Sequence, residues 1–447
     1  MLVSLTLLDL RGVPRADLAG RLPRPPAAEV FPAEAVAAIL AEVRAGGDGA
    51  LRELTKRFDG VEIGELRVAP EEVEAARRRV PAGLRASLEE AWARIVAYHR
   101  HEPAPVGDYG DGTVRIRHFA HGVDRAGLYA PGGRARYPST VLMCAAPAAV
   151  AGVGATVLCV PPGPDGAVAD ETLAAAAIAE VDEVYRVGGA QAIGAMAFGT
   201  ESIAPVDVIA GPGNRYVAEA KRQVAGMVGV PSAFAGPSEV VVVADESTPV
   251  TYAAVDLLVQ AEHGPDGLAW LVTWSPALAE AVTAEVDRQV SRSARRADLE
   301  ATLGSGGYAV IVDGPAEALA VANAVAPEHL ELLVADAEDL VEGVRRAGAV
   351  FLGPGVPASV GDYIAGPNHV LPTARTARFA SALRVDDFRT HVHAVALEAG
   401  ALERLGPHVV TLAEAEGLPA HADSIRQRLA GAGEGAVGDG DDGEVGP

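Results

Sequence analysis

Four segments in the C-terminal half of the chain carry pairs of polar side chains that could bind a metal ion or transfer protons. Each pair lies in a stretch that otherwise consists mostly of apolar residues. The pairs are Gln260 and His263 in VDLLVQAEHGPDG, Glu328 and His329 in AVAPEHLELLV, Asp362 and His369 in SVGDYIAGPNHVLPT, and Glu416 and His421 in LAEAEGLPAHADS. Burying such groups costs free energy unless a metal, a partner or a substrate satisfies them. We therefore expect the functional site to be built from these segments.

The first pair could belong to a metal site. Gln260 and His263 are three residues apart on an expected helix, so both side chains project from the same face. Asp362 in a Gly-flanked turn and His421 in a Pro-Ala-His loop could complete a set of nitrogen and oxygen ligands suited to zinc or a similar divalent metal. Local features alone favour a simpler interpretation, a His at a helix C-terminus beside a solvated Gln. Sequence spacing does not decide whether the four residues converge.

The second pair could transfer protons. Glu328 and His329 follow Pro327 at an expected joint between a helix and a strand. Neighbouring residues in an extended segment point to opposite sides, so the two side chains could serve distinct proton transfers at the edge of one site. A surface Glu beside a His at the edge of the core explains this dipeptide equally well.

Three glycine-rich loops could bind a cofactor. They are GLYAPGGRARYPS, VGGAQAIGAMAFG and AGPGNRYVAEAKRQ, and each joins an expected strand to an expected helix. Ligands of open α/β sheets bind beyond the carboxyl ends of the strands, where flexible backbone and helix N-termini can hold phosphate groups. A tight connection explains any one loop, but three in consecutive units favour a cofactor cleft. No G-x-G-x-x-G motif is followed by an acidic residue about 20 positions on, so a nicotinamide cofactor would bind in another mode than the usual Rossmann one.

These side chains must be positioned by an α/β fold. Residues 33–101 have the three-to-four spacing of apolar residues that predicts helices, with Pro and Gly between them. From about residue 125, short β-rich runs alternate with Ala-rich helical stretches, which predicts parallel sheets covered by helices, in two related lobes. Strand signals fade after about residue 384, where a small helical unit is expected. Residues 431–447 are rich in Gly and acidic residues and predict a disordered tail.

Composition limits the classes of protein. A chain of 447 residues is too long for one small core, and a hydrophobic content of 49% excludes a mostly disordered protein. The net charge of −23 argues against nucleic acid as a partner, because no basic cluster is available for the phosphate backbone. No signal peptide and no membrane-spanning run is apparent, so we expect a cytoplasmic protein. Cys144 and Cys159 have apolar neighbours and are expected to be reduced core thiols.

Longer motifs follow one another along the chain, among them GLYAPGGRARYPSTVLM, GGAQAIGAMAFGTESI, GPGNRYVAEAKRQV, AGPSEVVVVAD, VQAEHGPD, APEHLEL, VGDYIAGPNHVLPT and LAEAEGLPAHA. With these motifs the chain resembles the histidinol dehydrogenase family, apart from the first two dozen residues and the acidic tail. The resemblance implies two Rossmann-like, aldehyde-dehydrogenase-like parallel-sheet lobes and a small C-terminal helical domain. The expected division is an N-terminal segment (1–24), a main α/β domain with the metal and catalytic residues (25–127 and 239–383), an NAD-binding α/β domain (128–238), the helical domain (384–430) and the tail (431–447).

The resemblance also implies an activity, the zinc-dependent oxidation of L-histidinol to L-histidine through an aldehyde with two molecules of NAD, as the last step of histidine biosynthesis. The implied zinc ligands are Gln260, His263, Asp362 and His421, and the implied proton acceptors are Glu328 and His329. The implied cofactor contacts are Tyr129, Gln191 and Asn214. The implied substrate contacts are Ser238, Gln260, His263, His329, Asp362, His369, Glu416 and His421. The family's homodimer, with intertwined subunits, implies that Glu416 and His421 act in the partner's site.

Other functions remain open at this point. A relative could oxidise another small polar alcohol with the same zinc and NAD, although Glu416 and His369 suit a cationic amino-alcohol with an imidazole. A zinc hydrolase could use Glu328 to activate water, and absence of NAD binding would support that function. A non-catalytic scaffold could keep the metal for structure alone. Neither cysteine has a reactive context, which favours a hydrated aldehyde over a covalent thiol adduct in an oxidation.

Overall fold

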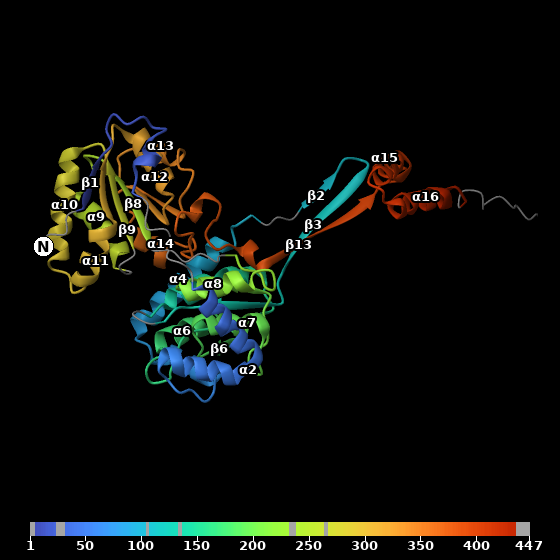
Figure 1. Ribbon diagram of the computed structural model, residues 1–447, viewed down its shortest axis with the longest axis horizontal. Coiled ribbons are helices and arrows are strands. Elements are labelled where there is room, and N and C mark those ends of the chain that lie inside the picture. Colours follow the sequence, from blue (N-terminus) through green and yellow to red (C-terminus); the bar gives the residue numbers. More distant parts are fainter. Residues whose placement is uncertain are drawn as a thin grey trace, which may run out of the picture. The chain divides into compact units, whose positions relative to one another are not determined.

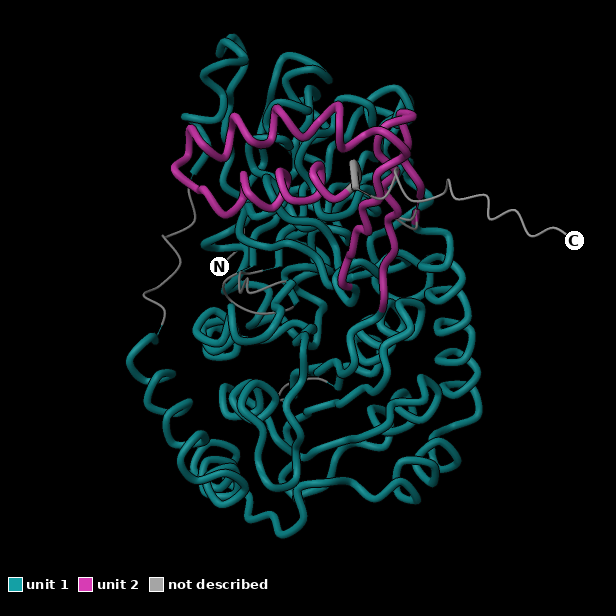
Figure 2. Tube along the Cα trace, turned by 90° about the vertical axis from the view of Figure 1, so that its right-hand side faces the viewer, with its two compact units in different colours: residues 1–102, 122–389 teal, residues 103–121, 390–447 magenta. Residues whose placement is uncertain are grey.

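The computed structural model describes residues 5–23, 32–103, 107–132, 136–231, 238–262 and 267–434. The chain forms two compact units (Figure 2). The larger unit comprises Met1–Glu102 and Gly122–Arg389, and the smaller unit comprises Pro103–His121 and Thr390–Pro447. No helix in the described part of the chain is long and apolar enough to cross a membrane.

The larger unit contains a six-stranded sheet in the order β1-β10-β9-β8-β11-β12, with every neighbouring pair parallel (Figure 1). Its strands are β1 (Thr6–Asp9), β8 (Glu239–Ala244), β9 (Leu268–Thr273), β10 (Gly307–Ile311), β11 (His329–Leu332) and β12 (Ala349–Leu352). Every residue of β8 and β9 is buried. Helices cover both faces, which is why these strands are nearly continuous apolar runs and do not alternate.

Alternate residues of β8 face the two helical layers. Val240 and Val242 pack with α9 (Val250–Ala261), α10 (Pro276–Val290) and α11 (Arg296–Gly306). Val241 and Val243 pack on the opposite face, whose helices are α1 (Leu18–Arg21), α12 (Pro315–Val325) and α13 (Ala337–Val341). The expected N-terminal segment therefore belongs to this lobe, through β1 and α1. Beyond β12 follow α14 (Ala358–Tyr363) and two 3-10 turns, η1 (Thr376–Arg378) and η2 (Val385–Phe388).

A second parallel sheet, in the order β6-β5-β4-β7, forms the other lobe of the larger unit. Its strands are β4 (Arg125–Tyr129), β5 (Ala155–Cys159), β6 (Glu183–Tyr185) and β7 (Val208–Ala210). One core joins it to α3 (Pro70–Arg79), α4 (Ala82–His99), α5 (Pro138–Ala151) and α6 (Asp170–Ile178). The other joins it to α2 (Ala33–Asp59), α7 (Gly189–Phe198) and α8 (Arg215–Val224). The predicted α/β fold with two parallel-sheet lobes is confirmed.

The N-terminal helices accompany the four-stranded sheet. The main packing partners of α2 and α3 are α7 and α6, and α4 packs on α5. The division expected from the sequence grouped residues 25–127 with 239–383 and so differs from these contacts. Amphipathic helices show that a face is buried but not which sheet buries it, so this pairing was not accessible from the sequence pattern.

The smaller unit is built from both strands and helices. A three-stranded sheet in the order β13-β3-β2 contains β2 (Gly107–Gly110), β3 (Val114–Gly122) and β13 (Arg389–Leu397), and α15 (Ala401–Ala415) packs against α16 (Pro419–Glu434). The expected C-terminal helical domain is present as α15 and α16, whereas strand β13, which precedes these helices, was not expected. Most of β13 is exposed, Val392 and Val395 included, so the strand lacks the apolar alternation of a half-buried one. Helix α16 extends through the first residues of the expected tail, and residues 435–447 lie outside the described residues.

Candidate active site

Glu328 and His329 lie at the amino end of β11. Helix α12 is capped by Ala326, whose left-handed backbone (φ 53°) turns the chain before Pro327. His329 then opens β11 and pairs with Val240 of β8. The rule that ligands bind beyond the carboxyl ends of parallel strands therefore does not find this pair, which lies at the opposite end.

The imidazole of His329 is held between two polar side chains. It is 3% exposed. The Nε2 of Gln260, in the last turn of α9, lies 3.2 Å from Nδ1, and Oδ1 of Asp362, in α14, lies 3.0 Å from Nε2. Because an amide nitrogen can only donate, Nδ1 accepts and the Nε2–H donates to the carboxylate. Two of the four expected metal ligands thus meet at one imidazole.

The carboxyl group of Glu328 also approaches this imidazole. Its Oε2 lies 3.7 Å from Nδ1 of His329 and accepts a hydrogen bond of 3.2 Å from the backbone N–H of Glu239. The sequence predicts that the two side chains point to opposite sides. The structure places them side by side because Glu328 precedes the strand and is not part of its pleat.

Burial and mutual charge set the proton affinities of this pair. Burial raises the pKa of Glu328, although the positive charge of His329 and a hydrogen bond with Ser238 partly oppose it. Burial lowers the pKa of His329, but the hydrogen bond to Asp362 and the charge of Glu328 outweigh it, so that the pKa is raised. A base of raised pKa and an acid of raised pKa in contact can exchange a proton without creating an isolated buried charge. The pair is suited to acid–base chemistry.

His369 lies beside Asp362. Its Nδ1 is 2.6 Å from the carbonyl oxygen of Asp362, and its Nε2 is 3.5 Å from Oγ1 of Thr140 in the first turn of α5. Helix α5 follows the first glycine-rich loop. His369 therefore connects the acid–base residues with the lobe that carries the three loops.

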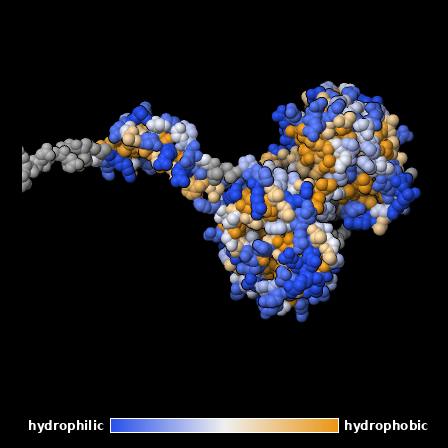
Figure 3. Space-filling model, turned by 180° about the vertical axis from the view of Figure 1, so that it is seen from behind, coloured by the Kyte–Doolittle hydropathy of each residue, from blue (hydrophilic) through white to orange (hydrophobic). Residues whose placement is uncertain are grey.

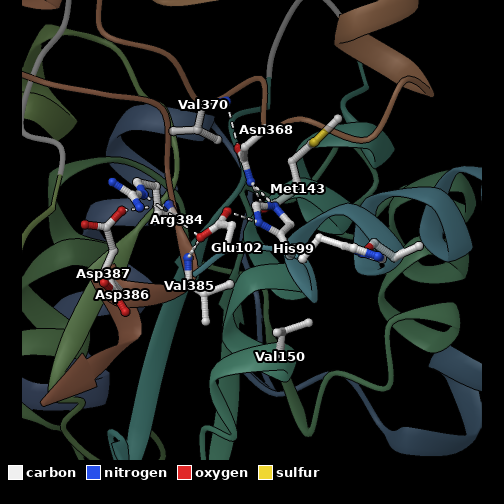
Figure 4. Close-up of polar contacts among 12 residues, drawn as sticks. His99, Glu102, Met143, Val150, Asn368, Val370, Arg384, Val385, Asp386 and Asp387 are labelled. Atoms are coloured by element: carbon white, nitrogen blue, oxygen red, sulfur yellow. Dashed lines mark hydrogen bonds and ion pairs between the residues drawn. The ribbon is translucent and has the colours of Figure 1, made fainter. Parts of the chain in front are cut away.

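A buried polar network holds the segment that carries His369 (Figure 4). The amide nitrogen of Asn368 donates to the carbonyl oxygen of Met143 (2.6 Å) and to Nε2 of His99 (3.2 Å). Nδ1 of His99 lies 2.6 Å from Oε1 of Glu102. Burial lowers the pKa of His99, so a neutral ring can donate from Nδ1 and accept at Nε2, which satisfies every contact. This chain fixes Asn368, the neighbour of His369, against α4 and α5.

Asp256 of α9 and Glu331 of β11 form a second carboxyl pair, farther along both elements from the pair of Gln260 and His329. The sequence pattern did not reveal it. Four helical residues advance about 6 Å and two strand residues about 6.6 Å. Asp256 on α9 therefore lies opposite Glu331 on β11, just as Gln260 lies opposite His329. Oε1 of Glu331 also accepts from the backbone N–H of Ala358, the first residue of α14 (3.1 Å). This pair joins the three elements that carry the site.

Burial raises the pKa of Glu331 to about 9, assisted by Asp256, whose own pKa burial also raises. The carboxyl group of Glu331 therefore keeps its proton in the folded protein to a higher pH than in the unfolded protein, where its pKa is near 4.5. The stability that it provides is full below pH 4.5 and is lost as the pH rises towards 9.

We expect Glu331→Gln to flatten this pH dependence. The free energy of unfolding of the parent protein should fall between about pH 5 and pH 9, and the variant should lose on the order of 2 kcal/mol less, since one pKa unit corresponds to about 1.4 kcal/mol. Urea denaturation across this range measures the difference, with Glu338→Gln, at an exposed position, as the control. Parallel curves for parent and Glu331→Gln would contradict the assignment.

The three glycine-rich loops meet at the carboxyl end of the four-stranded sheet. Tyr129 ends β4, and its buried hydroxyl accepts from the backbone N–H of Gly189 in the second loop (3.0 Å). Burial raises the pKa of Tyr129 to about 12, so the phenol stays neutral. Gln191 lies in the first turn of α7, buried. Asn214 caps α8, where its side chain accepts from the backbone N–H groups of Tyr216 and Val217.

Gly211 brings the third loop against the first. Its φ is +112°, and a Cβ atom at this position would lie 2.1 Å from the carbonyl oxygen of Tyr129. Only glycine fits such a close approach. The structure thus brings Tyr129 against the second and third loops and places Gln191 and Asn214 at the starts of the helices that follow those loops.

The remaining expected ligands do not belong to the described part of the larger unit. His263 lies outside the described residues. Glu416 and His421 are exposed side chains of the smaller unit, at the end of α15 and in the first turn of α16. Among the described residues, no group of three or more His, Cys, Asp or Glu side chains is arranged to hold a metal.

The residues present nevertheless fit a divalent metal. Oε1 of Gln260 is buried without a hydrogen-bond partner among the described residues. Such an atom is costly unless a ligand satisfies it. The neighbouring carboxylate of Asp362 offers a second oxygen ligand of the type that zinc accepts. Cys144 and Cys159 are buried, and burial raises both thiol pKa values to about 12, so neither is a reactive nucleophile.

Together the fold and the site define a two-lobed α/β enzyme, with an acid–base pair on one lobe and a loop cluster suited to a dinucleotide on the other. A family model for histidinol dehydrogenase matches residues 24–429. Histidinol dehydrogenases of Gluconobacter oxydans and Ruegeria pomeroyi are each 48% identical to the chain, over 89% of this chain and 93% of the first relative and over 88% and 91% for the second. The crystal structure of histidinol dehydrogenase from Elizabethkingia anophelis is similar with a TM-score of 0.91 at 32% identity, covering 96% of this chain and 99% of that one.

The chain belongs to the histidinol dehydrogenase family, and it is an oxidoreductase.

Proposed function

We propose that the chain oxidises L-histidinol to L-histidine through the aldehyde, with zinc and two molecules of NAD, as the last step of histidine biosynthesis. The observation that carries this proposal is the buried imidazole of His329 between Gln260 and Asp362, with the carboxyl group of Glu328 3.7 Å away. The choice of L-histidinol as the substrate is supported by the relatives, which are histidinol dehydrogenases.

The acid–base pair serves both oxidation steps. His329 accepts the proton of the substrate hydroxyl in the first step, because the neutral ring has a basic nitrogen and Asp362 stabilises its positive charge. In the hydration of the aldehyde, the oxygen of water bonds to the carbonyl carbon and its proton goes to Glu328. The carbonyl oxygen becomes a hydroxyl by taking the proton back from His329. This hydrated aldehyde is the substrate of the second oxidation.

Gln260 and Asp362 of one subunit would hold the zinc, together with His263 and His421. The loop cluster around Tyr129 would hold NAD, with Gln191 and Asn214. When bound, zinc would fix the nitrogen atoms of the substrate and NAD would accept two electrons in each step. Ser238, which interacts with Glu328, and His369 would contact the substrate from the larger unit. The loops favour this function over a zinc hydrolase, which would leave them unused.

We also propose a homodimer in which Glu416 and His421 complete the partner's site. The smaller unit exposes large apolar side chains among its hydrophilic ones (Figure 3). They are Val392, Val395, Leu397, Val409, Leu412 and Leu418. A group of exposed apolar residues on so small a unit supports binding to another copy of the chain, since monomeric proteins seldom leave large apolar patches in water.

The proposed function predicts the stoichiometry of the reaction. Purified protein loaded with zinc should form two NADH for each histidine produced from L-histidinol, and chelation should abolish this activity. NADH absorbance and chromatography of the product measure both. Binding of zinc without NADH formation or NAD binding would instead support a hydrolase, and oxidation of other alcohols alone would support a relative of different specificity.

Mixing two inactive variants tests the shared site. His329→Ala removes a residue of the larger unit, and His421→Ala removes one of the smaller unit. If the site is completed in trans, a mixed dimer has one doubly altered and one intact site, so co-expression should restore about a quarter of the parent activity. His421→Ala mixed with His263→Ala should behave in the same way. No recovery from mixed dimers isolated with two tags would contradict a site shared between subunits.

A further inference from the structure

A cavity of about 150 Å³ lies on the side of the six-stranded sheet opposite to α9. Glu239, Trp270 and Arg375 supply its polar lining, and Val325 belongs to its apolar wall. Ala19 and Gly20, which are exposed, line it as well, so it reaches the surface. A cavity of this size with polar walls holds several water molecules.

Three buried polar atoms of this lining have no hydrogen-bond partner among the described residues. They are Oε2 of Glu239, Nε1 of Trp270 and Nε of Arg375. Glu239 and Trp270 are only 1% and 2% exposed. Buried polar atoms are nearly always paired with protein or with ordered water. Their gathering at one cavity indicates that water occupies it.

Glu239 links this cavity to the acid–base pair. Because His329 pairs with Val240, the residues just before them, Glu328 before β11 and Glu239 at the start of β8, lie beside each other. The backbone N–H of Glu239 donates to Oε2 of Glu328. Each oxidation releases protons, and Glu328, which is buried, needs a way to pass them to solvent. The only carboxyl group in the described lining of the cavity is that of Glu239.

We propose that the cavity is a water-filled proton outlet for Glu328, in which Glu239 passes protons between the active site and solvent. A proton that Glu328 has taken from water passes to the neighbouring carboxylate of Glu239, which lines the cavity, and Glu328 regains its charge. Glu239 then releases the proton to water at the open end. No bond other than O–H bonds forms or breaks. This inference rests on the proposed role of Glu328 as a base.

The acidity of Glu239 suits such a relay. Burial raises its pKa to about 8, with the charge of Glu328 adding to the rise, while a backbone hydrogen bond from Arg375 and the charge of that residue lower it. These are the two charged groups that act on it, Glu328 from the segment just before β11 and Arg375 from the segment before η1. A carboxyl group with this pKa can both accept and release a proton near neutral pH.

Glu239→Gln tests the relay, because an amide keeps the size of the side chain but does not titrate. We expect kcat to fall at least about 10-fold, less than the 10²–10⁴-fold typical of losing a general base, with the KM values of both substrates unchanged. Proton transfer should become rate-limiting, so the solvent deuterium isotope effect on kcat should increase. Formate, which fits the cavity as a small carboxylate, should restore part of kcat. Glu219→Gln is the matched control, a buried glutamate on α8 paired with Arg222.

An unchanged kcat in Glu239→Gln would overturn the proposal. A lower kcat with no change in isotope effect and no rescue by formate would overturn it as well, since that is the result of a merely structural role. If Glu239→Gln does not fold, Glu239→Ala decides, because it removes the titrating group and leaves room for formate. A reduced kcat that formate restores is expected, and parent values would refute the relay. Glu328→Gln distinguishes failure of the outlet from failure of the base. If Glu328→Gln forms two NADH at the parent rate, Glu328 is not the base. If it forms only one NADH while Glu239→Gln behaves like the parent, Glu328 is the base and only the proposed outlet is wrong.

Discussion

His329→Ala should reduce kcat for the oxidation of L-histidinol about 10²–10⁴-fold, the range expected when a general base is lost. The imidazole is the only group that contacts Glu328, Gln260 and Asp362 together in the described part of the site. Removing it deletes the proton acceptor and also leaves the carboxylate of Asp362 without this partner. The effect should appear already in the first NADH formed in a single turnover.

His329→Asn separates these two contributions. The amide can donate to Asp362 but cannot accept a proton near neutral pH, so we expect it to be nearly as inactive as His329→Ala while binding zinc better. Zinc content and single-turnover NADH absorbance, measured on the same preparations, make the comparison. His101→Ala removes an exposed histidine whose contact is the carbonyl oxygen of Ala97 and should leave both quantities unchanged. A His329→Ala variant that retains a tenth of kcat or more would show that another group takes the proton.

Much of this site could be predicted from the sequence, because its polar residues lie in otherwise apolar segments. Glu328, His329, Gln260 and Asp362 were identified by that feature, and the structure brings all four together. What local spacing did not provide is their arrangement, because contacts between α9, β11 and α14 join segments that are about 30 to 70 residues apart. The family resemblance implied roles for these four residues but not their contacts, which the structure shows.

The same feature was present at Glu239, Asp256 and Glu331 but was not recognised. Each is a single carboxylate in an apolar run, SEVVVV, VDLLVQ or HLELLV. A lone acidic residue in such a run is usually an exposed one at the edge of a strand or helix. For Glu239 and Glu331 the difference is that helices cover both faces of β8 and β11, which leaves no exposed side, and Asp256 lies on the face of α9 that packs on this sheet. Continuous burial of a parallel strand, once predicted, is a reason to inspect each charged residue within it.

The alternation of strands and helices predicted the two parallel-sheet lobes correctly, because long periodic segments carry a strong signal. The assignment of α2, α3 and α4 to the four-stranded sheet was not predictable in the same way, since it depends on contacts across more than 100 residues. Strand β13 was missed because little of it is buried. Part of the site was unpredictable for the same reason, because His99 of α4 helps to hold the segment of His369 through Asn368.

Glu328→Gln should stop the reaction after the first oxidation. Glutamine has nearly the same size and keeps an oxygen that can accept from the backbone N–H of Glu239, so the fold around β11 should be preserved. His329 can still take the hydroxyl proton, although its pKa should fall because the charge of Glu328 contributes to raising it. The hydration of the aldehyde loses its base and should slow about 10²–10⁴-fold.

One NADH for each L-histidinol is therefore expected from Glu328→Gln in a single turnover, where the parent protein forms two. The aldehyde should accumulate and be trapped by hydroxylamine as an oxime that mass spectrometry identifies. Supplying the aldehyde directly should not restore the second NADH, which separates a defect in hydration from a defect in binding L-histidinol. Glu328→Asp retains a carboxylate on a shorter side chain and should recover part of the second step. If Glu328→Gln formed two NADH at the parent rate, water would be activated elsewhere, and the zinc itself would become the first group to test for that role.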